Sequence, residues 1–283
     1  MAARFFDGLD WPQAWFTTVR PVAESVIAAD DWRGQINALA AQSHIHNHRD
    51  LALQFVTQES LPEGVAYESH ISEAGAVPTR ENLHDFFNAL VWLTFPKIKR
   101  QLNALQSAQI ASLGIGKSRG TARDAATIFD ENAAILVVEN SAAGRALVDQ
   151  LREHQWHAAF IAQRAMFGRQ AEVWSFGHAL MEKLVKPYKA ITAHTWMVWA
   201  DATFFTLEWQ QRRSWLDTHV SEQLVSHNLS TADYTPLPIL GIPGWWPDQD
   251  QAFYADASVF RAKRVKPKFS IRPLSLRRNA DGV

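Results

Sequence analysis

One stretch constrains the fold more than any other part of the sequence, a helical pattern that runs up to a proline. After Thr79, which can serve as the N-cap, apolar residues recur at three- and four-residue spacing as far as Thr94. Pro96 cannot continue that helix, but proline suits the first turn of a new one. The pattern therefore predicts one helix over residues 79–94 and a second, at an angle to it, over residues 96–113. The apolar stripe of the first helix, which we expect to be buried, comprises Leu83, Phe86, Phe87, Leu90 and Leu93.

The remaining segments follow weaker patterns, most of them helical. Apolar runs at 125–129 and 134–138 flank a turn-forming sequence and predict an antiparallel β-hairpin. Residues 51–57 and 67–71 are predicted to be extended or hairpin-like. Together these segments predict an α+β fold that is predominantly α-helical with a small antiparallel β-hairpin or sheet. Further helices are predicted over residues 11–22, with an interruption at Pro21, and over 31–42, 142–156, 157–166, 170–185, 192–199 and 214–225, and an irregular proline-rich segment over 235–250.

Charge divides the chain into two parts. The 283 residues are 47% hydrophobic and 20% charged, which is typical of a globular protein. Residues 261–283 hold eight Lys or Arg and one Asp, a net +7, which leaves 20 basic and 28 acidic groups, a net −8, in residues 1–260. We predict a single main globular domain over 1–260 and a basic C-terminal tail over 261–283. The tail contains no recognised nucleic-acid module, so docking on the acidic body or simple solvation is favoured over nucleic-acid binding.

Targeting signals and cysteine chemistry are not indicated. Asp7, Asp10 and Pro12 interrupt the apolar run that a secretory signal needs, and the uncharged stretch 190–200 is too short to span a membrane. We therefore expect a cytoplasmic protein with no membrane segment. Cysteine is absent, which excludes disulfides, thiolate metal sites and cysteine nucleophiles. Any metal site must use His, Asp or Glu.

Several long segments resemble a known family. They lie at residues 78–106, 123–132 and 176–194, and in the sequences LPILGIPGWWP and FYADASVFR nearer the C-terminus. The chain resembles the uncharacterised bacterial family called domain of unknown function 3025, over about residues 53 to 261. The resemblance implies membership of that family but no particular activity, cofactor or catalytic residue.

Two helical patterns in these segments carry candidate metal ligands. His84 and Asn88 are four residues apart, as are His178 and Glu182, so each pair shares a helix face. Two facing helices can assemble such ligands for a divalent metal such as zinc. Alternatively, these histidines are buried hydrogen-bonding groups that hold the helices together. The candidate metal ligands are His84, His178, Glu182 and His194, with Asp85 or Asp124 as the catalytic base. Further ligands, or acceptors that hold the histidine tautomers, are offered by Asp85, Asp124 and Asp130.

Two weaker motifs complete the set of candidates. His44, His46 and His48 alternate as in a metal-binding strand, but the composition around them is that of a loop. The glycine-containing segment 114–120 lacks the spacing of a phosphate-binding loop and is predicted to be a basic connection. A cluster of cations nevertheless offers an anion-binding patch, made of Lys97, Lys99, Arg100, Lys117, Arg119 and Arg123.

The sequence favours one function over another without deciding between them. No motif reaches catalytic specificity, so we expect a binding protein for an anionic small molecule or macromolecular partner. The alternative is a metal-assisted hydrolase with a His/Glu/Asp site between helices. The candidate ligand-binding residues are Asn88, Lys97, Arg123 and Lys183.

Overall fold

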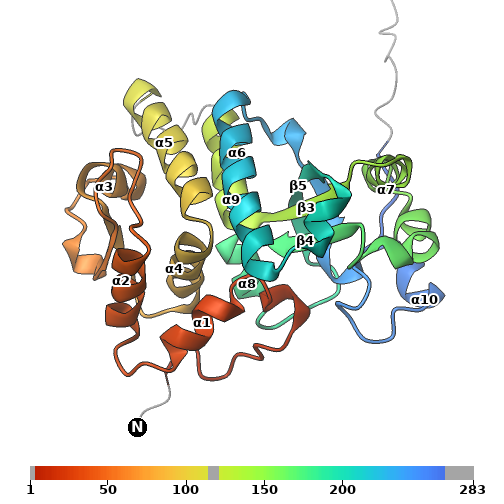
Figure 1. Ribbon diagram of the computed structural model, residues 1–283, viewed down its shortest axis with the longest axis horizontal. Coiled ribbons are helices and arrows are strands. Elements are labelled where there is room, and N and C mark those ends of the chain that lie inside the picture. The colour runs from red at the N-terminus through yellow and green to blue at the C-terminus, as the bar shows by residue number, and fades with distance from the viewer. Residues whose placement is uncertain (1–3, 114–120, 265–283) are drawn as a thin grey trace, which may run out of the picture.

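The computed structural model describes residues 4–113 and 121–264, and in this part of the chain helices surround a four-stranded mixed sheet (Figure 1). Helix makes up 53% and strand 13%, which confirms the predicted helix-rich α+β class. Lys117, Arg119 and the tail beyond residue 264 lie outside the described residues. The α-helices are α1 (Arg20–Ile27), α2 (Trp32–Gln42), α3 (Tyr67–Ala74), α4 (Leu83–Thr94), α5 (Pro96–Leu113), α6 (Thr121–Asn132), α7 (Ala142–Arg152), α8 (His178–Lys183), α9 (Trp209–Ser226) and α10 (Gln251–Tyr254).

The larger sheet has the strand order β4-β3-β5-β6. β3 is antiparallel to β4 and parallel to β5, and β5 is antiparallel to β6. β3 is buried along almost its whole length, as expected of a continuous apolar run in a central strand. β1 and β2 form a separate parallel pair. The strands are β1 (Gln54–Val56), β2 (Ala76–Pro78), β3 (Ala133–Glu139), β4 (Ala171–Ser175), β5 (Thr192–Ala200) and β6 (Thr235–Pro238).

Helices cover the sheet on both sides. α6 packs on β3 and β5, whereas α7 packs on β3 and β6, and Figure 1 shows the two helices on either side of the sheet. α5 lies beside α6 and also contacts α3 and α9. α4 and α6 both contact the short helix α8. α8 therefore lies where the helical layer meets the sheet.

The predicted stripe of α4 is confirmed for four of its five residues, while Leu83 at its start is half-buried. Phe86, Phe87 and Leu90 are fully buried and Leu93 is 9% exposed. The second predicted helix is confirmed as α5, which begins at Pro96. The N-cap was wrongly predicted, because it lies three residues after Thr79. The N-cap of α4 is Asn82, whose side-chain oxygen accepts from the backbone N–H of Asp85 at 2.8 Å.

The predicted β-hairpin around residues 130–133 is wrong. Residues 125–129 belong to α6, and only the second run, at 134–138, is a strand. Ala125, Ala126, Phe129 and Asp130 are buried at the spacing of a helix face, so the first apolar run is a helical stripe. β3 pairs instead with β4 and β5, which follow it by about 40 and 60 residues.

Four other sequence predictions are also wrong in type. Residues 192–199 form strand β5 rather than a helix, with burial that mostly alternates along the chain. The predicted helix over 170–185 is strand β4 followed by α8. Residues 67–71 are helical rather than extended, and 157–166 hold only short turns of π and 3-10 helix.

The other elements agree with the sequence more closely. The helices expected over 31–42, 142–156 and 214–225 are present as α2, α7 and α9, within a few residues at their ends. β1 lies within the extended segment predicted over 51–57. The helix predicted over residues 11–22 is wrong: within it only Ala14–Phe16 form a turn of 3-10 helix, and α1 begins at Arg20 with Pro21 in its first turn. The segment over 235–250 is partly regular, since it begins with β6 and a turn of 3-10 helix.

Two further sequence predictions concern the surroundings of the chain. Among the described residues, no helix combines the length and apolar character that crossing a bilayer requires. The cytoplasmic location stays a prediction. At the start of the basic tail, Lys263 forms an ion pair with Glu153 at 2.7 Å.

Candidate metal centre

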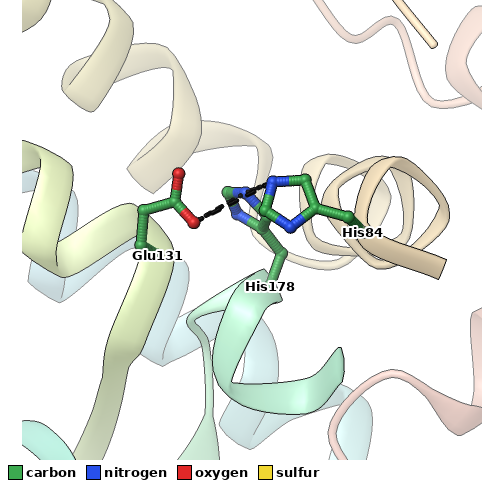
Figure 2. Close-up of side chains that lie close together, drawn as sticks. All are labelled: His84, Glu131 and His178. Carbon is green, nitrogen blue, oxygen red and sulfur yellow. Dashed lines mark hydrogen bonds and ion pairs between the residues drawn. The ribbon is translucent and has the colours of Figure 1, made fainter. Parts of the chain in front are cut away.

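Three helices bring His84, Glu131 and His178 together (Figure 2). His84 is in the first turn of α4, Glu131 is in the last turn of α6, and His178 is the first residue of α8. Gly177 permits this approach. A Cβ atom there would lie 2.5 Å from the carbonyl oxygen of Glu131, so only glycine lets α8 start against the end of α6.

The ligand atoms of the three side chains lie at the spacing of metal ligands. The Nε2 atoms of His84 and His178 are 3.1 Å apart. The Oε2 atom of Glu131 is 3.4 Å from Nε2 of His178 and 3.9 Å from Nε2 of His84. Zinc with bonds of about 2.0–2.1 Å places tetrahedral ligands roughly 3.3 Å apart. The three atoms therefore resemble one face of a zinc coordination tetrahedron.

Glu182 orients the ring of His84. Its Oε2 atom lies 2.9 Å from Nδ1 of His84. A carboxylate at this distance accepts the Nδ1 proton, which leaves the Nε2 lone pair directed at the cluster. In zinc sites, a carboxylate commonly accepts from the outer nitrogen of a histidine ligand in this way. Glu182 is therefore placed to orient a metal ligand rather than to bind the metal itself.

His178 is buried beside a second carboxylate. Its side chain is 4% exposed, and burial lowers the pKa of His178 to about 3, so its ring is neutral at neutral pH, as a metal ligand must be. Its Nδ1 atom is 4.0 Å from Asp130. Lys99, itself 4% exposed, donates to Asp130 at 2.5 Å and to Asn88 at 2.9 Å. Burial alone raises the pKa of Asp130, but the ammonium group of Lys99 lowers it overall, so this carboxylate stays ionised.

A polar cavity opens beside the cluster. It has a volume of about 320 Å³, and its walls include His84, Glu131 and His178 as well as Tyr67 and Glu68. The Tyr67 hydroxyl accepts from Asn88 at 3.0 Å, which leaves its own hydrogen for an acceptor in the cavity. Burial and nearby Asp130 raise the pKa of Glu68 to about 7. The cavity thus holds a hydroxyl donor and a carboxyl group able to exchange a proton near neutral pH.

The residues predicted as metal ligands are only partly assembled. His84, His178 and Glu182 come together as described. His194 lies on β5, where its Nδ1 atom is 3.0 Å from the side-chain nitrogen of Asn132. Among the described residues, the cluster of His, Asp or Glu ligand atoms within 4.8 Å of one another contains Glu131 instead of Glu182 and His194.

The two predicted catalytic bases differ in their surroundings. Asp85 lies in the wall of the cavity, but Arg80 donates to it three times, through its backbone N–H at 2.7 Å and its guanidinium at 2.9 and 3.0 Å. Both oxygens of Asp85 are therefore engaged. Asp124 is exposed in the first turn of α6, two turns before Glu131.

Those of the predicted anion-binding cations that the structure describes do not form one patch. Lys99 is buried against Asp130, and Lys97 donates to Thr218 at 2.8 Å. Lys183 is exposed on α8. Arg123 is half-buried and lines a second cavity of about 350 Å³.

Asn88, expected to bind a ligand, is 6% exposed. Its side chain donates a hydrogen bond to Tyr67 and accepts one from Lys99.

Sequence reasoning missed Glu131, Tyr67 and Glu68. Glu131 was assigned to a hairpin turn and the other two to an extended segment, so none had a helix face on which to place it. The four-residue spacing of the buried Ala125 and Phe129 was the available signal for α6.

The histidine triplet His44, His46 and His48 makes local contacts. The His48 ring lies 2.8 Å from the Ser72 hydroxyl, and the His46 ring lies 2.7 Å from the carbonyl oxygen of His44.

Fold and site together define a helix-rich α+β protein with a candidate three-residue metal centre in the walls of a polar cavity. The chain belongs to the family described as protein of unknown function (DUF3025), whose model matches residues 53–264. This match confirms the resemblance seen in the sequence and includes all three candidate ligands. No curated protein and no solved structure matches the chain.

Proposed function

We propose that this protein is a metal-dependent hydrolase that binds one divalent ion, such as zinc, through His84, His178 and Glu131. The observation that supports the proposal most directly is the 3.1–3.9 Å spacing of the three ligand atoms. Two neutral imidazoles and a carboxylate form a ligand set that zinc uses in hydrolytic enzymes, where water occupies the fourth position. The orienting contact of Glu182 supports the same interpretation.

The cavity supplies the other groups that a hydrolysis needs. Water adds as hydroxide to the electrophilic carbon or phosphorus of the substrate, the bond from that atom to the leaving group breaks, and the proton that the water released passes to the leaving group. A bound metal would make that water acidic enough to ionise near neutral pH. In this proposal Glu68 carries the proton, because Asp85 is engaged by Arg80 and Asp124 is exposed. Tyr67 donates to the oxygen on which negative charge develops.

A non-catalytic binding protein for an anionic partner remains the alternative. Lys99 and Lys97 give it little support, since both are engaged within the fold. Arg123 supports it, but a cationic side chain in a cavity is equally compatible with an enzyme. The two functions differ in their need for metal at the three-residue cluster.

Metal content tests the proposal. The full-length protein, produced without a histidine tag, should contain about one equivalent of zinc or a similar divalent ion by mass spectrometry. His84→Ala, His178→Ala and Glu131→Gln should each lose it, while the exposed His157→Ala serves as the matched control. His194→Ala should retain the metal. Absence of metal from the purified protein, together with no binding of Zn²⁺, Co²⁺ or Mn²⁺ by calorimetry, would overturn the proposal.

Activity provides the second measurement. The metal-loaded protein should hydrolyse at least one member of a panel of chromogenic carboxylic and phosphoric esters, and a chelator should abolish that activity. The ligand variants should lose the activity and His157→Ala should keep it. Stoichiometric metal without any hydrolysis across the panel would favour a structural or binding role for the ion.

A further inference from the structure

The cavity at the metal cluster has a neighbour that shares its wall. The two cavities have volumes of about 320 and 350 Å³. Both are lined by Tyr67, Glu68, Asp130 and Glu131. The second cavity continues along α6, away from the two histidines. The combined volume of the two cavities falls within the roughly 300–1,000 Å³ that is typical of small-molecule sites.

One face of α6 runs along this second cavity. Arg123, Thr127 and Glu131 follow at intervals of four residues, and all three line it. With a rise of about 1.5 Å per residue, the backbone positions of Arg123 and Glu131 are roughly 12 Å apart along the helix. A cation, a hydroxyl and a candidate metal ligand therefore succeed one another along a single wall.

Arg123 is the cation of this wall that has no fixed partner. Within residues 4–113 and 121–264, no ion pair or hydrogen bond is formed by its guanidinium, whereas Arg80 is paired with Asp85 and Lys99 with Asp130. Glu68 lines the same cavity, and the charge of Arg123 opposes the rise that burial causes in the pKa of Glu68. The half-buried guanidinium of Arg123 therefore presents hydrogen-bond donors to an oxyanion in this cavity.

We propose that the substrate is an elongated small molecule with a terminal carboxylate or phosphate, which binds Arg123 while the bond to be hydrolysed lies at His84, His178 and Glu131. This inference rests on the proposed function. It assigns a length and a charge to the substrate, because the anionic group and the reacting bond must be separated by about the distance between the two ends of the α6 wall. Hydrolysis of such a molecule consumes only water.

The test uses hydroxamic acids of graded length on the zinc-loaded, full-length protein. The hydroxamate group binds zinc, and the other end carries a methyl, a carboxylate or a phosphonate group after roughly two to eight methylenes. Affinity, measured by calorimetry, should peak at one intermediate length for the anionic series and not for the methyl series. Arg123→Gln should weaken the best anionic probe at least about tenfold and leave its methyl analogue unchanged.

Controls separate the possible outcomes. The exposed Arg169→Gln should bind every probe as the wild type does, and Arg123→Lys should retain part of the anionic preference. Equal affinity of charged and methyl probes, or an anionic preference that survives Arg123→Gln, would overturn the inference while the metal centre stands. If no metal binds, the proposed function fails, and binding of inorganic phosphate to wild type and Arg123→Gln then tests Arg123 alone. Equal phosphate affinity in that comparison would also overturn the inference.

Discussion

Glu182 lies 2.9 Å from Nδ1 of His84, while Nε2 of the same ring lies 3.1 Å from His178. One ring thus connects a carboxylate on its outer side with a second imidazole on its inner side. In the proposed metal centre, Glu182 would therefore affect metal affinity through His84 without being a ligand.

Glu182→Gln should therefore weaken zinc binding by about 10- to 100-fold without abolishing it. The amide keeps the shape of the side chain but loses the charge that favours the required tautomer of His84. Competition with a chromophoric chelator measures the affinity. Glu222→Gln, an exposed site on α9, is the matched control. Complete loss of metal in Glu182→Gln would instead indicate that Glu182 is itself a ligand.

The buried pair of Lys99 and Asp130 should be essential for stability. Lys99→Met leaves the Asp130 carboxylate buried without its partner and should lower the free energy of unfolding by about 3–5 kcal/mol. The next residue, Arg100, is exposed and 3.8 Å from Asp50, so Arg100→Met should cost less than about 1 kcal/mol. Urea denaturation compares the two. The double variant Lys99→Met/Asp130→Asn should recover part of the loss, and no recovery would contradict this explanation.

Phe87 should be among the most costly core residues to truncate. It is fully buried on α4 and stacks on Phe16 with ring centres 5.5 Å apart. Phe87→Ala should lower the free energy of unfolding by about 3–5 kcal/mol. Leu51, which is 37% exposed, provides the control, since Leu51→Ala should change stability far less. Similar losses for both variants would disagree with the packing described for α4.

Asp217 should make stability depend on pH. Its carboxylate accepts from the backbone N–H groups of Lys97 and Ile98 at the start of α5. Burial nevertheless raises the pKa of Asp217 from 3.8 to about 6. The folded protein therefore holds the proton of Asp217 more tightly than the unfolded chain does. The resulting contribution of Asp217 to the free energy of unfolding is full below pH 3.8 and is lost as the pH rises through about 6.

The comparison of wild type with Asp217→Asn isolates this effect, since other groups titrate in both proteins. Between pH 4 and pH 7, the wild type should lose about 2 kcal/mol of unfolding free energy relative to Asp217→Asn. Urea denaturation across that range provides the measurement. A wild type that gains stability relative to the variant as the pH rises would show that the backbone donors outweigh burial.

The elements that could be predicted from sequence are those with a local cause. α4 and α5 follow from an apolar stripe and from Pro96, and both signals act within a few residues. β3 and β5 depend on partners far along the chain, so the run 134–138 was joined to its nearest apolar neighbour. Strand β5 was mistaken for a helix because its pairing with β3 cannot be read from its own sequence.

The candidate site shows the same division. His84, His178 and Glu182 were identified because four-residue spacing on a helix is visible in the sequence. Glu131 was missed because its helix was not recognised. The burial of Lys99 could not be predicted either, since a lysine stays buried only through a partner such as Asp130, which is 31 residues away.

Helix α8 has only six residues, too few to be stable alone, yet it carries both His178 and Glu182. If α8 unravels, a ligand and the carboxylate that orients another ligand are lost in a single event. Occupancy of the centre and the folding of this one segment are therefore thermodynamically linked, and a bound ion would slow amide hydrogen exchange in α8 more than elsewhere. The stability of the shortest helix of the site would thus depend on whether the ion is bound.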